Sequence, residues 1–159
     1  MQLSDGLATV IDRALKRCHD FLVTSTWHGR ENELVNLFAQ HCLPAEMQPG
    51  GCLQSQSQVA VEVAVPQVTN SSKKYVRKDL VIWPEPLMTA WSGIPAAIIE
   101  WKRDQIRHCS TDIEWLEQFT ERFPMTVGYS VCGFLKEPRG ISFTRVQCGV
   151  ARQTINLRQ

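Results

Sequence analysis

The chain has 159 residues, of which 43% are hydrophobic and 21% are charged, and its formal net charge is +1. This composition indicates one folded domain and excludes a disordered chain, and the small net charge excludes a protein that coats nucleic acid through a general basic excess. No stretch approaches the roughly 20 apolar residues that span a bilayer and no signal-peptide pattern opens the chain, so we expect a soluble, cytoplasmic protein that does not bind membranes.

The first third of the chain predicts two amphipathic helices. Residues 4–22 place apolar side chains at i, i+3, i+4 and i+7, the spacing of a helix with one buried face. After a break, a second helix is expected over about 30–43, and Pro44 follows its end. The polar and Gly-containing segment beyond it is typical of a loop.

From residue 58 the hydrophobic period changes to two, which predicts strands. Valines alternate with smaller or polar residues up to Val65, as in a half-buried strand. A turn at 69–72 and a second strand over 75–83 complete a hairpin. Residues 96–101 form a short, almost wholly apolar run, which suits the middle of a sheet covered on both faces.

The remaining segments predict one helix and two strands. Thr111-Asp112-Ile113-Glu114 is a capping box, which predicts the start of a helix that Pro124 ends. Strands are expected over 125–135 and near 141–148. The order α-α-β-β-β-α-β-β indicates a mixed α/β (α+β) fold in which helices flank a central mixed sheet.

Cysteines and histidines do not form a recognisable zinc-binding pattern. The six cysteines lack C-x-x-C spacing, which favours reduced and partly buried thiols over disulfides or zinc ligands. The four histidines add no ligand set, because His41 and Cys42 would point to different faces of a helix.

Acidic residues on two consecutive predicted strands carry the chemistry. The odd-numbered residues of 75–83, Asp79 among them, are expected to share a face, as are Ile98, Glu100 and Lys102 on the next strand. If the strands are neighbours, Asp79 and Glu100 converge. Two close carboxylates repel each other, and Mg²⁺ or Mn²⁺ relieves that repulsion through hard oxygen ligands.

This arrangement resembles the PD-(D/E)XK nuclease superfamily, whose core is αβββαβ. The matching segments are Val76-Arg77-Lys78-Asp79-Leu80-Val81-Ile82 and Ile98-Ile99-Glu100-Trp101-Lys102. The resemblance covers about residues 30–135 of a single domain, with 1–28 as an N-terminal helical extension and 136–159 as a C-terminal strand and tail. The departure is Lys78, which stands where the family nominally has Pro.

The resemblance implies a Mg²⁺- or Mn²⁺-dependent endonuclease of the restriction-endonuclease-like fold, acting on DNA rather than RNA. Asp79, Glu100 and the Trp101 carbonyl would hold the metal, and Lys102 would help a metal-activated water to hydrolyse the phosphodiester bond. The family often has a Glu on the helix before its strands. Glu31 fits that place, because it shares the apolar stripe of its helix.

Basic residues flank the predicted site and are candidate contacts to nucleic acid, although each cluster taken alone is better explained as solvated strand ends and loops. They are Lys73, Lys74, Arg77, Lys78, Arg103 and Arg107. No separate recognition domain is evident, so specificity would come from a homodimer, a partner subunit or the structure of the nucleic acid.

Structural alternatives exist for each site residue. Asp79 could pair with Arg77 or Arg103, Lys102 could be the first solvated residue after its strand, and Glu31 could be a favourable charge in the first turn of its helix. Glu100 is harder to explain in this way, because an unpaired carboxylate is costly in a central strand. The alternative function is a catalytically inactive nuclease-like module that binds nucleic acid or a protein partner.

Overall fold

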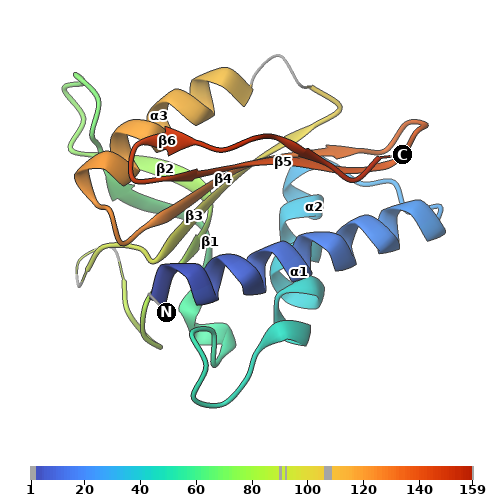
Figure 1. The fold of residues 1–159 in the computed structure, drawn as a ribbon, viewed down its shortest axis with the longest axis horizontal. Coiled ribbons are helices and arrows are strands. Elements are labelled where there is room, and N and C mark those ends of the chain that lie inside the picture. The colour runs from blue at the N-terminus through green and yellow to red at the C-terminus, as the bar shows by residue number, and fades with distance from the viewer. Residues whose placement is uncertain (1–2, 90, 92, 106–108, 159) are drawn as a thin grey trace.

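The computed structural model of the protein describes residues 3–89, 91, 93–105 and 109–158. Within that part of the chain the strands form one seven-stranded sheet with the order β1-β2-β3-β4-β5-β6, and β7 pairs with β5 (Figure 1). The strands are β1 (Val59–Pro66), β2 (Tyr75–Ile82), β3 (Ala97–Arg103), β4 (Val127–Phe134), β5 (Gly140–Gln147), β6 (Val150–Ala151) and β7 (Ile155–Asn156).

The helices precede the sheet or connect its strands. They are α1 (Leu3–Thr24), α2 (Glu31–Leu37), the π-helix η1 (Phe38–Cys42), the short 3-10 helices η2 (Pro44–Glu46) and η3 (Gln56–Gln58), and α3 (Cys109–Arg122). None of the helices that the structure describes is both long enough and apolar enough to cross a membrane.

Neighbouring strands are antiparallel except β3 and β4, which are parallel. A parallel pair needs a crossover connection, and α3 supplies it. The sheet is therefore mixed, and the predicted mixed α/β fold class is confirmed. Residues 97–101 of β3 are all buried, as expected for a strand in the middle of the sheet.

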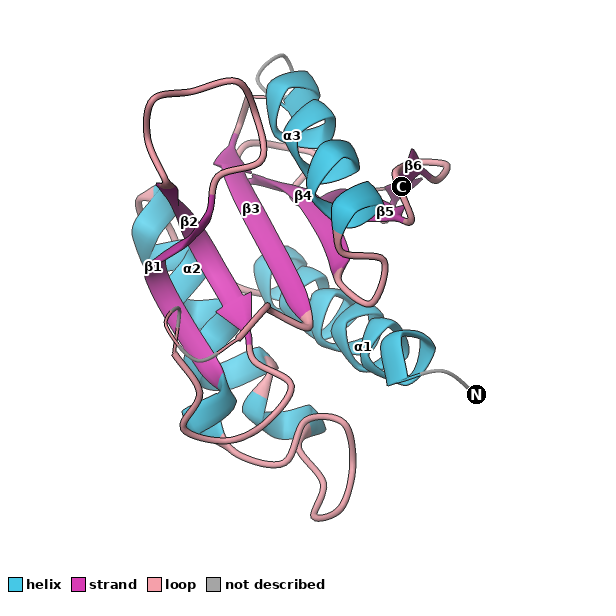
Figure 2. Cartoon of the chain, turned by 90° about the vertical axis from the view of Figure 1, so that its left-hand side faces the viewer, coloured by secondary structure: helices cyan, strands magenta, loops and turns pink. Residues whose placement is uncertain are grey.

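The sheet separates two hydrophobic cores. In the first core, Leu80 and Ile99 pack with α1, α2 and η1 through residues such as Leu15. In the second core, on the opposite face, Val81 and Ile98 pack against α3. Figure 2 shows α3 on one side of the strands, with α1 and α2 on the other. Both faces are covered at the end of β2 and in the first half of β3, which explains the apolar runs Leu80–Ile82 and Ala97–Ile99.

Two predicted details differ from the structure, and two short strands were not predicted. The second helix is α-helical only over Glu31–Leu37 and continues as a π-helix. α3 begins at Cys109, so Thr111 lies inside its first turn and the predicted capping box is wrong. Between Cys148 and the end of the chain, β6 and β7 were not predicted, because strands of two residues are too short to show a periodic pattern.

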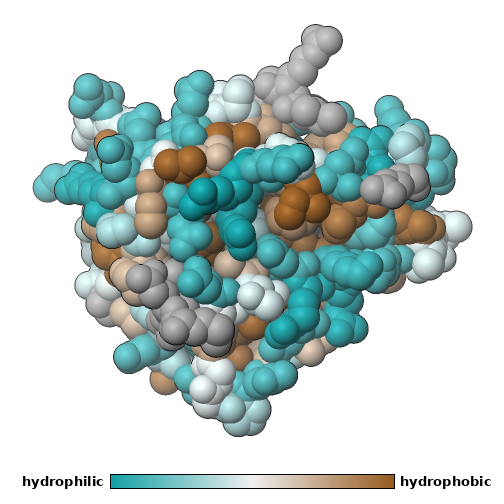
Figure 3. Space-filling view, viewed as in Figure 1, coloured by the Kyte–Doolittle hydropathy of each residue, from teal (hydrophilic) through white to brown (hydrophobic). Residues whose placement is uncertain are grey.

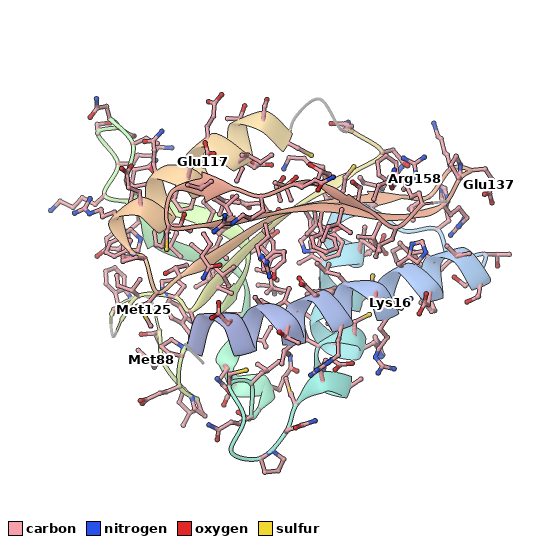
Figure 4. The ribbon with its side chains drawn as sticks, viewed as in Figure 1. Lys16, Met88, Glu117, Met125, Glu137 and Arg158 are labelled. Carbon is pink, nitrogen blue, oxygen red and sulfur yellow. The ribbon has the colours of Figure 1, made fainter. Side chains whose placement is uncertain are left out.

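All six cysteines are free thiols, as predicted. The C-terminal segment is held by side-chain contacts at the end of the molecule where Figure 4 labels Glu137 and Arg158. The Arg158 guanidinium lies 3.5 Å from the centroid of the Phe134 ring and donates a hydrogen bond to the Pro138 carbonyl at 2.7 Å. These contacts fix the tail against the β4–β5 turn.

The face of the molecule in Figure 3 is mainly hydrophilic, with hydrophobic side chains in small separate groups. Single exposed apolar side chains are normal on a folded protein. Gln58 is completely buried, although it is polar and belongs to a Gln/Ser-rich stretch.

Gln58 connects the loop before β1 to the end of β2. Its Oε1 accepts hydrogen bonds from the backbone N–H groups of Gln54 and Ser55, at 2.7 and 3.2 Å. Its Nε2 donates to the carbonyls of Cys52 and Trp83, both at 3.1 Å. One buried side chain thus pairs with at least four backbone groups, and buried backbone groups need such partners.

Gln58→Ala is expected to lower the free energy of unfolding by at least about 2 kcal/mol, because unpaired buried polar groups are costly. Gln54→Ala, at an exposed position four residues earlier, should change it by less than about 0.5 kcal/mol. Urea denaturation of both variants measures the difference. Equal losses would mean that the Gln58 network does not hold this loop.

Candidate active site at the separation of β2 and β3

β2 and β3 separate at the point where Asp79 and Glu100 face each other. The ladder between the strands pairs Leu80 with Ile99 and continues toward residues 82 and 97. Beyond Leu80, hydrogen bonds to side-chain carboxylates join the two strands. The Asp79 N–H donates to Glu100 Oε2 at 3.3 Å, and the Trp101 N–H donates to Asp79 Oδ2 at 2.7 Å. Each carboxylate therefore binds the backbone of the other strand.

The β1–β2 hairpin is distorted next to this separation. Val61 pairs with Leu80 and Val63 pairs with Lys78, but the ladder skips the intervening Glu62 and Asp79. Glu62 has a φ of +50°, in the left-handed region that residues other than glycine seldom adopt. The register is the same on either side of the missing pair, so neither strand carries an extra residue relative to the other.

The distortion reverses the faces of β2. Val81 belongs to the second core, and the even-numbered Val76 also packs against it. Asp79 instead lines a hollow beside α2. The prediction that the odd-numbered residues of this strand share one face is therefore wrong, because the pleat does not continue through Asp79.

Glu100 is buried and paired with Lys78. Its Oε1 accepts a short hydrogen bond from the Lys78 ammonium, and the two residues are 6% and 5% exposed. Burial raises the pKa of the Glu100 carboxyl and the charge of Asp79 raises it further, whereas the Lys78 charge opposes the shift. Lys78 was predicted to contact nucleic acid, but in the structure it is buried and its ammonium is paired with Glu100.

Lys102 lies between β3 and the first turn of α3. Its ammonium donates to the Trp101 carbonyl at 3.0 Å and forms an ion pair with Asp112 at 3.3 Å. Burial lowers the pKa of Lys102, but the carboxylates of Asp112, Asp79 and Glu31 outweigh burial and the pKa is raised. Lys102 therefore remains a cation and a hydrogen-bond donor at neutral pH.

Asp112 was not predicted as a site residue. In the sequence it is only the second residue of the misplaced capping box, and nothing in its spacing connects it to β3. The crossover through α3 places Asp112 next to Lys102. The one signal in the sequence was an acidic residue in the first turn of that helix.

Glu31 approaches the site from the start of α2. Its Oε2 accepts a hydrogen bond from the Arg103 N–H at 3.0 Å, so it binds the end of β3. Two hollows share Glu31 as a lining residue. The first, of about 450 Å³, is lined by Glu31, Asn32, Val35, Asn36, Val61, Glu62 and Asp79. The second, of about 470 Å³, is lined by Glu31, Arg103, Asp104, Gln105 and Lys136.

The structure thus brings Glu31, Asp79, Glu100 and Lys102 into one region, and it separates the predicted basic contacts. Lys73 and Lys74 are exposed near the hairpin turn. Arg77 is exposed and forms an ion pair with Glu62 at 3.5 Å. Arg103 is half-buried and donates to the Gly29 carbonyl. Arg107 lies outside the described residues.

The strand separation holds oxygen atoms of the kind that a hard divalent cation binds. Asp79, Glu100 and the Trp101 carbonyl are adjacent through the hydrogen bonds given above, and carboxylate and carbonyl oxygens are the ligands that Mg²⁺ prefers. Among the described residues, no three His, Cys, Asp or Glu side chains are arranged to hold a metal ion. A bound ion would therefore use the two carboxylates with the main-chain carbonyl, and Lys78 competes with it at Glu100.

No protein-family model, no curated protein and no solved structure matches this chain.

Asp79→Asn is expected to leave the free energy of unfolding equal to that of the wild type or slightly higher. Asparagine keeps an oxygen acceptor for the buried Trp101 N–H and removes a negative charge beside Glu100. Asp79→Ala removes the acceptor and should cost about 1–3 kcal/mol. Denaturation in EDTA compares the two variants, and a loss in Asp79→Asn as large as in Asp79→Ala would assign the Asp79 charge a structural role.

Proposed function

We propose that the protein is a Mg²⁺- or Mn²⁺-dependent nuclease that hydrolyses phosphodiester bonds, with DNA as its substrate. The observation that supports this proposal best is the reciprocal pairing of Asp79 and Glu100 across separating strands, with Lys102 held beside them. The resemblance to the PD-(D/E)XK superfamily implies the same three residues, and it is also the basis for choosing DNA.

Charge supports the need for a divalent ion. The hollow of about 450 Å³ is lined by three carboxylates, those of Glu31, Glu62 and Asp79. A phosphodiester is itself an anion, so its approach to such a surface is unfavourable unless cations offset the repulsion. Asp79, Glu100 and the Trp101 carbonyl would hold the metal, which supplies Lewis-acid stabilisation of charge on the phosphate oxygens.

The protein's own groups would orient the reactants. Lys102 is fixed by the Trp101 carbonyl and by Asp112, so its ammonium is available as a preorganised donor to a phosphate oxygen. Because its pKa is raised, Lys102 would act as a charged donor and not as a general base. Glu31 borders both hollows and would accept a hydrogen bond from water near the phosphate.

A second candidate function is a nuclease-like module that binds nucleic acid or a protein without cleaving it. The Lys78–Glu100 ion pair favours it, since this pair neutralises one proposed metal ligand internally. Both functions are compared by incubating the protein with single- and double-stranded DNA and RNA in Mg²⁺ and in Mn²⁺. Absence of cleavage of all four substrates would favour the binding module.

Lys102→Ala is expected to lower the single-turnover cleavage rate about a hundredfold or more, while weakening binding much less. Interactions formed mainly in the transition state affect turnover more than ground-state affinity. The measurement pairs binding in Ca²⁺ with cleavage in Mg²⁺ on one DNA oligonucleotide.

The matched variant is Lys73→Ala/Lys74→Ala, which removes two exposed charges near the hairpin turn. It should weaken binding at low salt and reduce the slope of log affinity against log salt, because each lost phosphate contact removes counterion release. Equal losses of binding and cleavage for Lys102→Ala would make Lys102 an ordinary basic contact.

A further inference from the structure

Lys78 occupies a position that is unusual for an ammonium group. It is 5% exposed, although its neighbour Arg77 is exposed. Its Nζ bonds to Glu100 and lies 3.5 Å from the centroid of the Trp115 ring. The reversal of faces at Asp79 turns Lys78 toward the second core, which is otherwise apolar and aromatic.

Burial of an ammonium group is costly, and a buried ion pair seldom stabilises a fold more than well-packed apolar residues would. The packing of the second core alone therefore does not account for a lysine here. What Lys78 does supply is a positive charge on Glu100, at the same carboxylate that a divalent ion would use.

Both oxygens of Glu100 are engaged. Oε1 accepts the Lys78 ammonium and Oε2 accepts the Asp79 N–H. The Asp79 N–H belongs to the backbone and stays in place, whereas the lysine side chain has rotatable bonds. A cation that binds Glu100 therefore competes with Lys78, because two positive charges at one carboxylate repel each other.

We propose that Lys78 is an internal counter-ion that a divalent metal displaces from Glu100, with the Trp115 ring retaining the ammonium after displacement. This inference rests on the proposed metal-dependent function. The face of an indole ring attracts a desolvated cation, and the contact with Trp115 already exists while Lys78 is bound to Glu100. Lys78 thus lowers the affinity of the site for metal and neutralises Glu100 until the metal binds.

The first test measures Mn²⁺ binding by electron paramagnetic resonance in Lys78→Met and in a control. Methionine keeps most of the side-chain volume and removes the competing charge, so Mn²⁺ should bind at least about tenfold more tightly. Lys16→Met is the control. It removes the same charge from the exposed face of α1 (Figure 4), and its Mn²⁺ affinity should match the wild type within about twofold. Unchanged or weaker Mn²⁺ binding by Lys78→Met would overturn the proposal.

The second test establishes that Glu100 mediates the gain. Adding Glu100→Gln to Lys78→Met removes the carboxylate for which lysine and metal compete, so the tenfold gain in Mn²⁺ affinity should be lost. If the double variant keeps the gain, Lys78 acts on the metal through another group and the proposal is wrong.

A third measurement uses the unsubstituted side chain at position 78, so it does not depend on whether Lys78→Met folds. Displacement changes the surroundings of Trp115, and the tryptophan emission should shift more as Mg²⁺ saturates the wild type than as it saturates Trp115→Phe, in which only the other tryptophans, Trp101 among them, respond. A saturating Mg²⁺ titration that leaves the Trp115 contribution unchanged would contradict displacement.

Failure of this inference is distinguishable from failure of the proposed function. If neither the wild type nor Lys78→Met binds Mn²⁺, the metal-dependent function and the displacement of Lys78 are both rejected. If both bind Mn²⁺ with equal affinity, the function stands and only the role of Lys78 is rejected.

Discussion

The site depends on the exchange of hydrogen bonds between two carboxylates and the backbones of β2 and β3. In a regular sheet, backbone N–H groups bind the carbonyls of neighbouring strands. The N–H groups of Asp79 and Trp101 do not follow this pattern. Here carboxylate oxygens accept both of them, so the strands separate without leaving buried donors unpaired. Lys102, Asp112 and Glu31 then take positions around this separation, each bound to β3 or to a residue next to it.

Much of the fold was predictable because its signals are local. The period of 3.6 in α1, the period of two in β1 and the apolar run of β3 each reflect which side chains face a core. The mixed class followed from the order of these segments. The start of α3 was misplaced, because a sequence that can cap a helix need not do so, and η1 continued α2 with a π-helical pattern that periodicity does not distinguish.

The candidate site was predictable only in part, for a related reason. Asp79, Glu100 and Lys102 could be named from two motifs, but the environment of each depends on contacts distant in sequence. Lys78 appeared to belong with the exposed basic residues until the reversal of faces turned it inward toward Trp115. Asp112 reaches Lys102 only through the crossover of α3. A rule of strict alternation cannot anticipate a position at which one pair is missing from the ladder and the side chains beyond it point to the opposite face.

The missing Glu62–Asp79 pair has a consequence for changes in chain length. Because Glu62 and Asp79 are skipped together, the hairpin beyond them keeps its register with respect to the rest of the sheet. An insertion of one residue in each strand beyond this point would preserve the pairing and leave Asp79 beside α2. An insertion of one residue in β2 alone, between Lys78 and Leu80, would shift residues 75–78 of β2 by one position relative to residues 63–66 of β1. Length variation in this hairpin is therefore expected in pairs of residues and at its turn.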